Sequence, residues 1–401
     1  MRIALVTEVF LPAVDGVVTR LRRTLEELQR HGDEVLVVAP AGGPDFYAGA
    51  RIVGIPGLRV PLYPDGTGYP EKRVSLPVPQ LRTALDAFAP DVVHAINPFL
   101  LSAGAVHYAH RRRIPLIASY HANIAAYSQY YGLGAFEALG WRYVIWLHNR
   151  ADVNLCTSAA TLAALRARGI QRLALWPYGI ERGRFSPHWA THEWRERLSG
   201  GHPERVIVLC VGRLAKEKSL HRLQPVVRDV EGISLAIVGD GPERTQLERA
   251  FAGTATNFLG LLAGEELSRA YASADAFLFP SDSETLGMVI LEAHAAGLPV
   301  LAADTPAARE LVHDGIDGLR YDARDPDALA GAVRRLAQDR ALREAMAEAA
   351  PEAVAGASWR EATDALRAQY LAVTGMKPPG DGPRPHSEPA APPAASATVL
   401  P

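Results

Sequence analysis

The chain has 401 residues, of which 48% are hydrophobic and 21% charged, with a formal net charge of −2. This composition excludes a disordered or fibrous protein, and the length suggests two or three domains. No apolar run approaches the roughly 20 residues that span a bilayer, and the start reads as a strand rather than a signal peptide. We therefore expect a cytoplasmic protein, peripheral at most on the inner face of a membrane, with no nucleic-acid partner.

Charge is unevenly distributed along the chain. Residues 1–185 carry 20 Lys and Arg against 14 Asp and Glu, which gives +6, whereas the remainder carries 22 against 30, which gives −8. The basic half is the one expected to face an anionic partner, such as a phospholipid surface. Ordinary variation of surface charge is the alternative.

The first half alternates short apolar runs with helical periodicity. Strands are expected at residues 2–6, 34–39, 91–94, 115–119 and 152–156. Helices are expected at residues 17–30, 100–112, 136–149 and 159–168. Such alternation predicts a parallel sheet with helices on both faces, whose ligands bind beyond the carboxyl ends of the strands.

Two residues of this half are candidates for a binding site. Gly16 opens a helix, where a phosphate can approach the backbone closely, although a plain tight turn is the alternative. His121 follows a predicted strand end, which favours a site role. His107 and His110 lie within a helix and are interpreted as structural or surface residues, and His94 is left open.

The stretch Tyr120–Trp146 is unusually aromatic, and arginines lie within it and just after it. Core packing of a long helix explains some of the rings but not the tyrosines in the loop before the helix. The pattern favours a membrane interface or an acceptor groove for sugar and lipid. The run Arg111–Arg113 can add phospholipid contacts, with a solvated helix end as the alternative.

The second half repeats the strand–helix alternation. Strands are expected at residues 206–211, 234–238, 257–260, 276–279 and 299–302, and closing helices at residues 326–337, 341–349 and 359–373. The proline-rich tail from residue 376 cannot build a core and is expected to be disordered. Cys156 and Cys210 lie in apolar runs and are expected to be buried thiols without metal-ligand spacing.

Two cations follow the first strand of this half. Arg213 and Lys218 come after Gly212 and together can neutralise a diphosphate, although a charged loop is the alternative. The backbone of Asn257–Gly260 can face a base, and Leu262 just beyond it is expected among the donor-binding residues.

The stretch Ser281–Glu292 lies between an apolar strand and a helix that ends at a glycine. Backbone N–H groups of Thr285, Leu286 and Gly287 would form an anion site at the start of the helix. Glu284 and Glu292 flank that site, and an unbroken helix would separate them by roughly 12 Å. Two carboxylates around an anion site suit a nucleotide-diphosphate sugar, although a solvated helix face is the alternative.

These motifs together resemble the retaining glycosyltransferases of family four, which have the α/β GT-B fold of two Rossmann-like parallel-sheet domains facing a cleft. The resemblance covers about residues 1–372. The motifs that carry it are Asp15-Gly16, Ser119-Tyr-His121, Gly212-Arg213 with Glu217-Lys218, Gly239–Glu243 and Glu284–Glu292.

The resemblance implies four segments and a set of site residues. Residues 1–185 would bind the acceptor, 186–357 would bind the nucleotide sugar, 358–375 would be a helix packing back on the first domain, and 376–401 would be a disordered tail. Gly16, Arg213 and Lys218 would hold the diphosphate, His121 and Glu284 the donor sugar, and Glu292 the ribose. His121, Glu284, Arg213 and Lys218 are the expected catalytic residues.

Within the family the chain looks most like sulfoquinovosyl-diacylglycerol synthases and bacterial lipid mannosyl- and glucosyltransferases. Residues 147–152, 271–275 and 280–287 carry this similarity. One departure is Tyr178-Gly-Ile-Glu181, where the family often has Asn-Gly-Val-Asp, and it leaves the role of that segment open.

The activity implied is transfer of a hexose, with retention, from a nucleotide-diphosphate sugar to a lipid such as diacylglycerol or a glycolipid. A UDP-sugar is favoured over GDP-mannose, and neither metal nor cofactor is expected. Three alternatives stay open: a transferase for a soluble acceptor, a GT-B sugar-nucleotide epimerase, and a non-catalytic sugar-nucleotide sensor.

Overall fold

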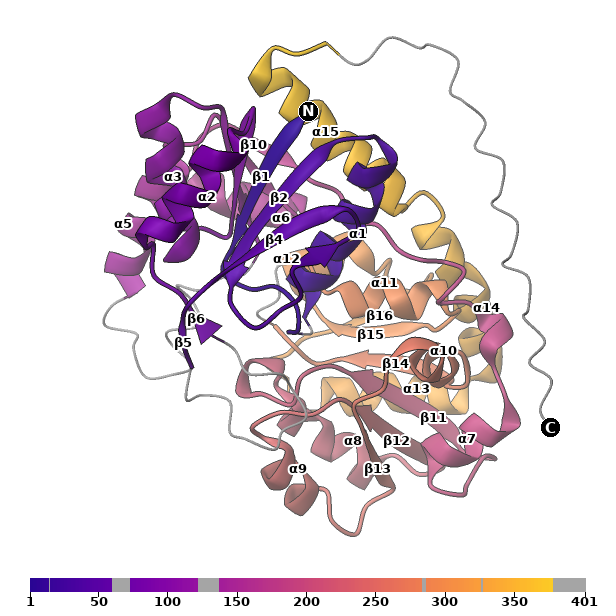
Figure 1. Cartoon of the computed structure of the whole chain (residues 1–401). Helices are drawn as coiled ribbons and strands as arrows, with labels where there is room; N and C mark the ends of the chain where they lie inside the picture. The colour runs from indigo at the N-terminus through magenta and orange to yellow at the C-terminus, as the bar shows by residue number, and fades with distance from the viewer. Residues whose placement is uncertain (14, 60–72, 122–136, 283–285, 326, 378–401) are drawn as a thin grey trace, which may run out of the picture.

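The computed structural model describes residues 1–13, 15–59, 73–121, 137–282, 286–325 and 327–377, which form two α/β domains (Figure 1). The predicted Glu284 and Thr285, the tyrosines of the loop before residue 137, and the tail lie outside these residues. Within the described residues, no helix combines the length and hydropathy needed to cross a membrane.

The first domain is built around an eight-stranded sheet in the order β10-β9-β8-β7-β1-β2-β4-β3, parallel except for β3. Its strands are β1 (Arg2–Thr7), β2 (Glu34–Pro40), β3 (Phe46–Tyr47), β4 (Ala50–Ile55), β7 (Val92–Ile96), β8 (Leu116–Tyr120), β9 (Val153–Cys156) and β10 (Leu173–Leu175). Its helices are α1 (Gly16–Arg30), α2 (Pro79–Phe88), α3 (Leu101–Arg112), α5 (Glu137–His148) and α6 (Ala159–Ala167). Strand β5 (Leu58–Arg59) pairs antiparallel with β6 (Arg73–Val74) in a separate two-stranded sheet.

The second domain contains a six-stranded parallel sheet in the order β13-β12-β11-β14-β15-β16. Its strands are β11 (Val206–Val211), β12 (Ile233–Val238), β13 (Thr256–Gly260), β14 (Ala276–Phe279), β15 (Val300–Ala303) and β16 (Gly318–Tyr321). Its helices are α7 (His192–Ser199), α8 (Gln224–Asp229), α9 (Arg244–Ala250), α10 (Gly264–Ala272), α11 (Met288–Ala295), α12 (Pro306–Leu311), α13 (Ala328–Gln338) and α14 (Arg340–Ala349). The predicted class of two parallel-sheet domains is therefore confirmed.

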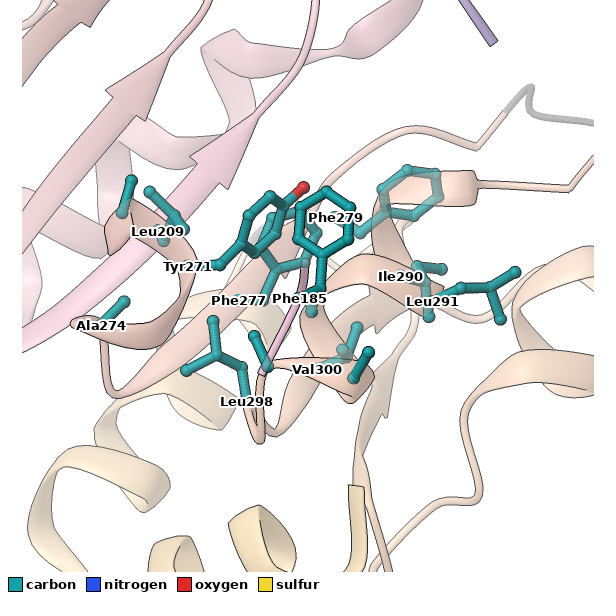
Figure 2. Close-up of a cluster of buried hydrophobic side chains, with 14 of the residues drawn as sticks. Phe185, Leu209, Tyr271, Ala274, Phe277, Phe279, Ile290, Leu291, Leu298 and Val300 are labelled. Atoms are coloured by element: carbon teal, nitrogen blue, oxygen red, sulfur yellow. The ribbon is translucent and has the colours of Figure 1, made fainter. Parts of the chain in front are cut away.

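Each sheet is covered on both faces because its central strands are apolar at consecutive positions. On β14, Phe277 and Phe279 pack on one face, where Figure 2 shows them among buried rings, while Leu278 packs on the other. Burying each such side chain contributes about 1.5–3 kcal/mol. Cys156 and Cys210 are buried free thiols, as predicted.

The chain crosses from the first core to the second after β10. Trp176 packs in the core of the first domain, whereas Ile180 and Phe185 pack in that of the second. A second contact joins α12 to α6, where the Glu310 carboxylate accepts hydrogen bonds from the backbone N–H groups of Ala159 and Ala160. A carboxylate is favoured at this helix start by the helix dipole.

The last helix, α15 (Trp359–Thr374), returns to the first domain and packs against α1. Figure 1 shows it in yellow beside the indigo strands of that domain. Arg367 on α15 donates from Nε to Oδ2 of the buried Asp33 at 2.7 Å, and Tyr370 is fully buried in the first core. The chain therefore ends its described part on the domain in which it began.

Candidate active site

The loops beyond β11 and β12 are packed backbone against backbone. The Leu214 N–H donates to the Asp240 carbonyl at 2.8 Å. Gly239 has a φ of 134°, and a Cβ there would lie 1.9 Å from the Gly212 carbonyl oxygen. Only glycine fits such a position, so these loops hold the carboxyl edge of the sheet in one arrangement.

Arg213 and Lys218 both lie at this edge, as predicted. A short 3₁₀ turn at Lys216–Lys218 brings Glu217 back to Arg213, and the two form an ion pair. Glu217 is buried, and its carbonyl accepts a hydrogen bond from Ser281 Oγ at 3.0 Å. The pair orients the Arg213 guanidinium and offsets part of its charge. Sequence reasoning gave Glu217 no role, although the i, i+4 spacing from Arg213 was a signal for such a pair.

The predicted anion site at 284–287 differs from the sequence-based geometry. Helix α11 begins only at Met288, and Gly287 before it has a left-handed φ of 84°. Leu286 and Gly287 therefore precede the helix, so the unbroken helix from Glu284 to Glu292 that the roughly 12 Å estimate assumed was wrong. Glu284 lies outside the described residues, and its separation from Glu292 stays a prediction. The predicted helix end at Gly297 is confirmed, since its N–H donates to the His294 carbonyl at 3.0 Å.

Glu292 lies on α11 above the apolar cluster of the second domain. The hydroxyl of Tyr271, which Figure 2 shows among the rings of that cluster, donates to Oε2 of Glu292 at 2.8 Å. Burial raises the pKa of Glu292 to about 7, and the Tyr271 hydrogen bond and the nearby Arg184 counteract this only in part. Tyr271 was missed as a site residue because its contact is 21 positions away in sequence.

Gly16 lies directly against α11 of the other domain. Asp15 caps α1 by accepting from the Val18 N–H at 3.0 Å, and a Cβ on Gly16 would lie 2.9 Å from the Met288 sulfur. The starts of α1 and α11, both predicted to bind anions, therefore meet between the domains. The positive ends of two helix dipoles at one point favour a diphosphate.

The segment that departs from the family pattern forms a wall beside this meeting point. The Tyr178 hydroxyl donates to the Gly16 carbonyl at 3.3 Å and contacts the Met288 sulfur. Its ring lies 4.8 Å from that of Trp359 and 4.4 Å from the Arg20 guanidinium carbon. A narrow pocket lies here, lined among others by Thr19, Arg23, Tyr178, Glu181, Met288 and Glu292.

Arg20 binds the crossing between the domains. Its guanidinium donates to the carbonyls of Trp176 and Pro177 at 3.0–3.2 Å and stacks over the Trp176 ring at 4.2 Å. Burial lowers the pKa of Arg20 to about 10. The guanidinium remains charged at neutral pH and lies close to His94 in the middle of β7 and to His121 just beyond β8.

His121 lies just beyond β8, where the sequence placed it. Its Nε2 is 2.8 Å from Ser119 Oγ, and its backbone N–H donates to Asn97 Oδ1 at 3.3 Å. Burial, and then the Arg20 charge, lower the pKa of His121 well below its ordinary value. The imidazole is therefore neutral at pH 7 and can act as a hydrogen-bond partner rather than as a cation.

Leu262 lies just after β13 and packs, half-buried, against the core of the second domain. The end of β13 is held by the Gly239 N–H, which donates to the Gly260 carbonyl at 2.8 Å. The contact of Leu262 with a donor base stays a prediction.

The aromatic residues of α5 divide between core and surface. The Trp141 ring stacks on Tyr120, and the Tyr143 hydroxyl donates to the Phe99 carbonyl, so both belong to the packing of the domain. Leu139 and Trp146 are exposed by 65% and 42%, and the Arg150 guanidinium lies 3.5 Å from the Trp146 ring centre. Core packing thus explains part of the aromatic stretch, and an exposed apolar part remains.

Two parallel-sheet domains that face each other at their strand ends are the arrangement of the GT-B glycosyltransferases. Sucrose-phosphate synthase from Thermosynechococcus elongatus superposes with a TM-score of 0.75 over 93% of this chain and 99% of its own, at 21% identity. The model described as Glycosyltransferase Family 4 matches residues 14–184, and that described as Glycosyl transferases group 1 matches residues 193–353. The chain belongs to glycosyltransferase family 4 and is a glycosyltransferase.

Three relatives illustrate the range of this family. The chain is 36% identical to the sulfoquinovosyl transferase SQD2 of Arabidopsis thaliana, over 90% of this chain and 71% of the relative. It is 37% identical to a GDP-mannose-dependent alpha-mannosyltransferase of Mycobacterium tuberculosis, over 94% of this chain and 98% of the relative. It is 27% identical to the alpha-monoglucosyldiacylglycerol synthase of Streptococcus pneumoniae, over 83% of this chain and 77% of the relative.

Proposed function

We propose that this protein transfers a hexose, with retention of anomeric configuration, from a nucleotide-diphosphate sugar to a lipid acceptor at an anionic membrane surface. The observation that carries the donor half is the meeting of the α1 and α11 starts at Gly16 and Met288, with Glu292 lining the same pocket. Arg213 and Lys218 supply two cations beyond the carboxyl end of β11. The lipid half is supported by the exposed Leu139 and Trp146 on α5 and by the name of the diacylglycerol-modifying relative.

In this proposal, negative charge grows on the leaving diphosphate as the sugar acquires oxocarbenium character. Lys218, the oriented Arg213 and the two helix starts stabilise that charge, and one such contact is typically worth about 3–4 kcal/mol of transition-state energy. Glu292 accepts hydrogen bonds from the ribose, and His121 contacts the transferred sugar, as does Glu284 by resemblance. The leaving phosphate assists attack of the acceptor from the same face of the sugar.

The donor is proposed to be a UDP-sugar or GDP-mannose. The sequence favoured the first, whereas one similar relative is named for GDP-mannose. The backbone of the Asn257–Gly260 strand and Leu262 would contact the base in either case.

A donor panel tests the proposal. Purified full-length protein is incubated with UDP-glucose, UDP-galactose, UDP-sulfoquinovose or GDP-mannose, each with and without a total polar-lipid extract, while nucleotide release and sugar label in the organic phase are followed. Lipid-dependent release with label in the lipid is the expected result, and the Lys218→Ala variant is the inactive control. Release that needs no acceptor would instead identify an epimerase or hydrolase, and transfer only to soluble sugars would remove the lipid acceptor.

A further inference from the structure

A buried chain of four side chains runs from α15 to His121. The Tyr370 hydroxyl lies 2.7 Å from Nδ1 of His94, and Nε2 of His94 lies 2.9 Å from Ser119 Oγ. The same oxygen lies 2.8 Å from Nε2 of His121. Tyr370, His94 and Ser119 are fully buried and His121 is nearly so. Groups buried in this way satisfy their hydrogen bonds inside the protein.

Both imidazoles in the chain are neutral. Burial and the Arg20 charge lower the pKa of His94 to about 3 and that of His121 well below its ordinary value. A neutral imidazole carries a single N–H, so one ring nitrogen donates and the other accepts. The tautomer of each histidine therefore depends on whether the group that contacts a ring nitrogen donates a hydrogen bond to it or accepts one from it.

The single proton of Ser119 links the two histidines. Its hydroxyl meets a ring nitrogen on each side and can donate to only one of them, so the other must donate to it. The direction is decided at the Tyr370 end. Among the described residues, the Tyr370 hydroxyl has its hydrogen-bond partner in Nδ1 of His94. A phenol that only accepted there would bury an unsatisfied proton.

The protons can then be followed along the chain. Tyr370 donates to Nδ1 of His94, so the proton of His94 is on Nε2 and is donated to Ser119. Ser119 in turn donates to Nε2 of His121, which leaves the His121 proton on Nδ1. The His121 ring is held in this orientation by the Trp176 ring, whose centre lies 5.4 Å away.

We propose that Tyr370 is a positioning residue which, through His94 and Ser119, fixes the tautomer of His121 as the one protonated on Nδ1. The inference rests on the proposed contact of His121 with the transferred sugar. The opposite tautomer would carry its proton on Nε2 and donate it to Ser119. A helix that follows the nucleotide-binding domain in sequence thus sets the chemistry of a residue in the other domain.

The test reads the tautomer directly and needs no substrate. Full-length protein labelled with ¹⁵N-histidine is examined by long-range ¹H–¹⁵N correlation, and His121 is assigned from the signals lost in His121→Gln. We expect Nδ1 of His121 to be protonated in the wild type. Tyr370→Phe, which keeps the ring and removes the donor, should raise the population protonated on Nε2, and Ser119→Ala should do the same by breaking the bridge. Tyr108→Phe, whose hydroxyl binds Asp86 on the surface, is the matched control and should change nothing.

Activity is then measured with UDP-glucose and GDP-mannose, each with polar lipids. Tyr370→Phe is expected to lower kcat/KM about tenfold to hundredfold, by loss of one well-placed hydrogen bond, with an unchanged circular dichroism spectrum. A wild-type His121 protonated on Nε2, or a tautomer that stays unchanged in both variants, would overturn the inference. A tautomer shift with normal kcat/KM would uphold control by Tyr370 and remove the sugar contact of His121 from the proposed function.

Discussion

Replacing Glu292 by glutamine should stabilise the unliganded protein above pH 7. Burial raises the pKa of Glu292 from its ordinary 4.5 to about 7, so folding favours the protonated form. The contribution of this protonated carboxyl to the free energy of unfolding is fully present below pH 4.5 and is lost as the pH rises through about 7. At about 1.4 kcal/mol per pH unit the loss is at most about 3 kcal/mol. Because the side chain is still partly exposed, we expect about 2 kcal/mol after solvent screening.

Glutamine avoids this loss because it is neutral at every pH and its amide oxygen can still accept the Tyr271 hydrogen bond. In a domain of this size, about 2 kcal/mol corresponds to a rise of roughly 4–8 °C in Tm. The assay is differential scanning calorimetry of wild type and Glu292→Gln at pH 5.5 and pH 8.5, with Glu348→Gln on the exposed face of α14 as the control. A gain at pH 8.5 that shrinks at pH 5.5 is expected. A variant no more stable than wild type at pH 8.5, or equally stabilised at both, refutes the reasoning.

The same substitution should weaken nucleotide binding. Hydrogen bonds to a charged acceptor are worth about 1.5–3 kcal/mol, so the Kd for UDP or GDP at pH 8.5 should rise about tenfold to hundredfold. Isothermal titration of both nucleotides against both proteins measures this. An unchanged Kd would exclude Glu292 from the ribose site and leave the stability argument intact.

Lys218→Ala should lower turnover by about 10²–10³-fold while Tm stays within a few degrees, since it removes one charge from the diphosphate site; near-normal turnover would remove that assignment. Activity should survive excess EDTA, because two cations and two helix starts are available to the diphosphate, and a loss that magnesium restores would contradict this. Vesicles containing anionic lipid should sediment the protein at low salt and release it as salt rises. Replacing Arg111–Arg113 by serine should weaken that binding about 30-fold. Arg112 is already paired with Asp86, so the estimate counts only Arg111 and Arg113, at about 1 kcal/mol each. Wild-type protein that stays in the supernatant with anionic vesicles would count against membrane contact.

How far sequence reasoning reached depends on whether a feature is local. β11 and β14 were predicted with the observed bounds because each is a short, wholly apolar run followed by a polar turn or proline. α2 was missed because it starts at Pro79 behind Val78, whose side chain makes no capping hydrogen bond. β4 and β16 were missed because each is short and contains an exposed or half-buried arginine, so neither reads as a buried strand.

The site divides in the same way. His121 and Arg213 follow closely on the ends of β8 and β11, and Lys218 follows a few residues later, so their positions at these edges could be predicted from the sequence. Glu217 contacts Arg213 at a local i, i+4 spacing that could have been used. Tyr271 contacts Glu292 across 21 positions and Tyr370 contacts His94 across 276. No local sequence pattern reports these last two contacts. The start of α11 was misplaced for a related reason, because the left-handed Gly287 before it interrupts what looked like a continuous helix.

The return of α15 to the first domain has a consequence for the order in which this protein is made. The N-terminal sheet leaves the ribosome long before residues 359–374, so during synthesis it lacks the helix that fills its core with Leu366 and Tyr370. Until α15 is made, the buried Asp33 lacks its hydrogen bond from Arg367, and Nδ1 of His94 lacks its hydrogen bond with the Tyr370 hydroxyl. The first domain is thus finished last, and a fragment that stops at the domain boundary would expose an apolar groove on the nascent sheet, the kind of surface that chaperones hold.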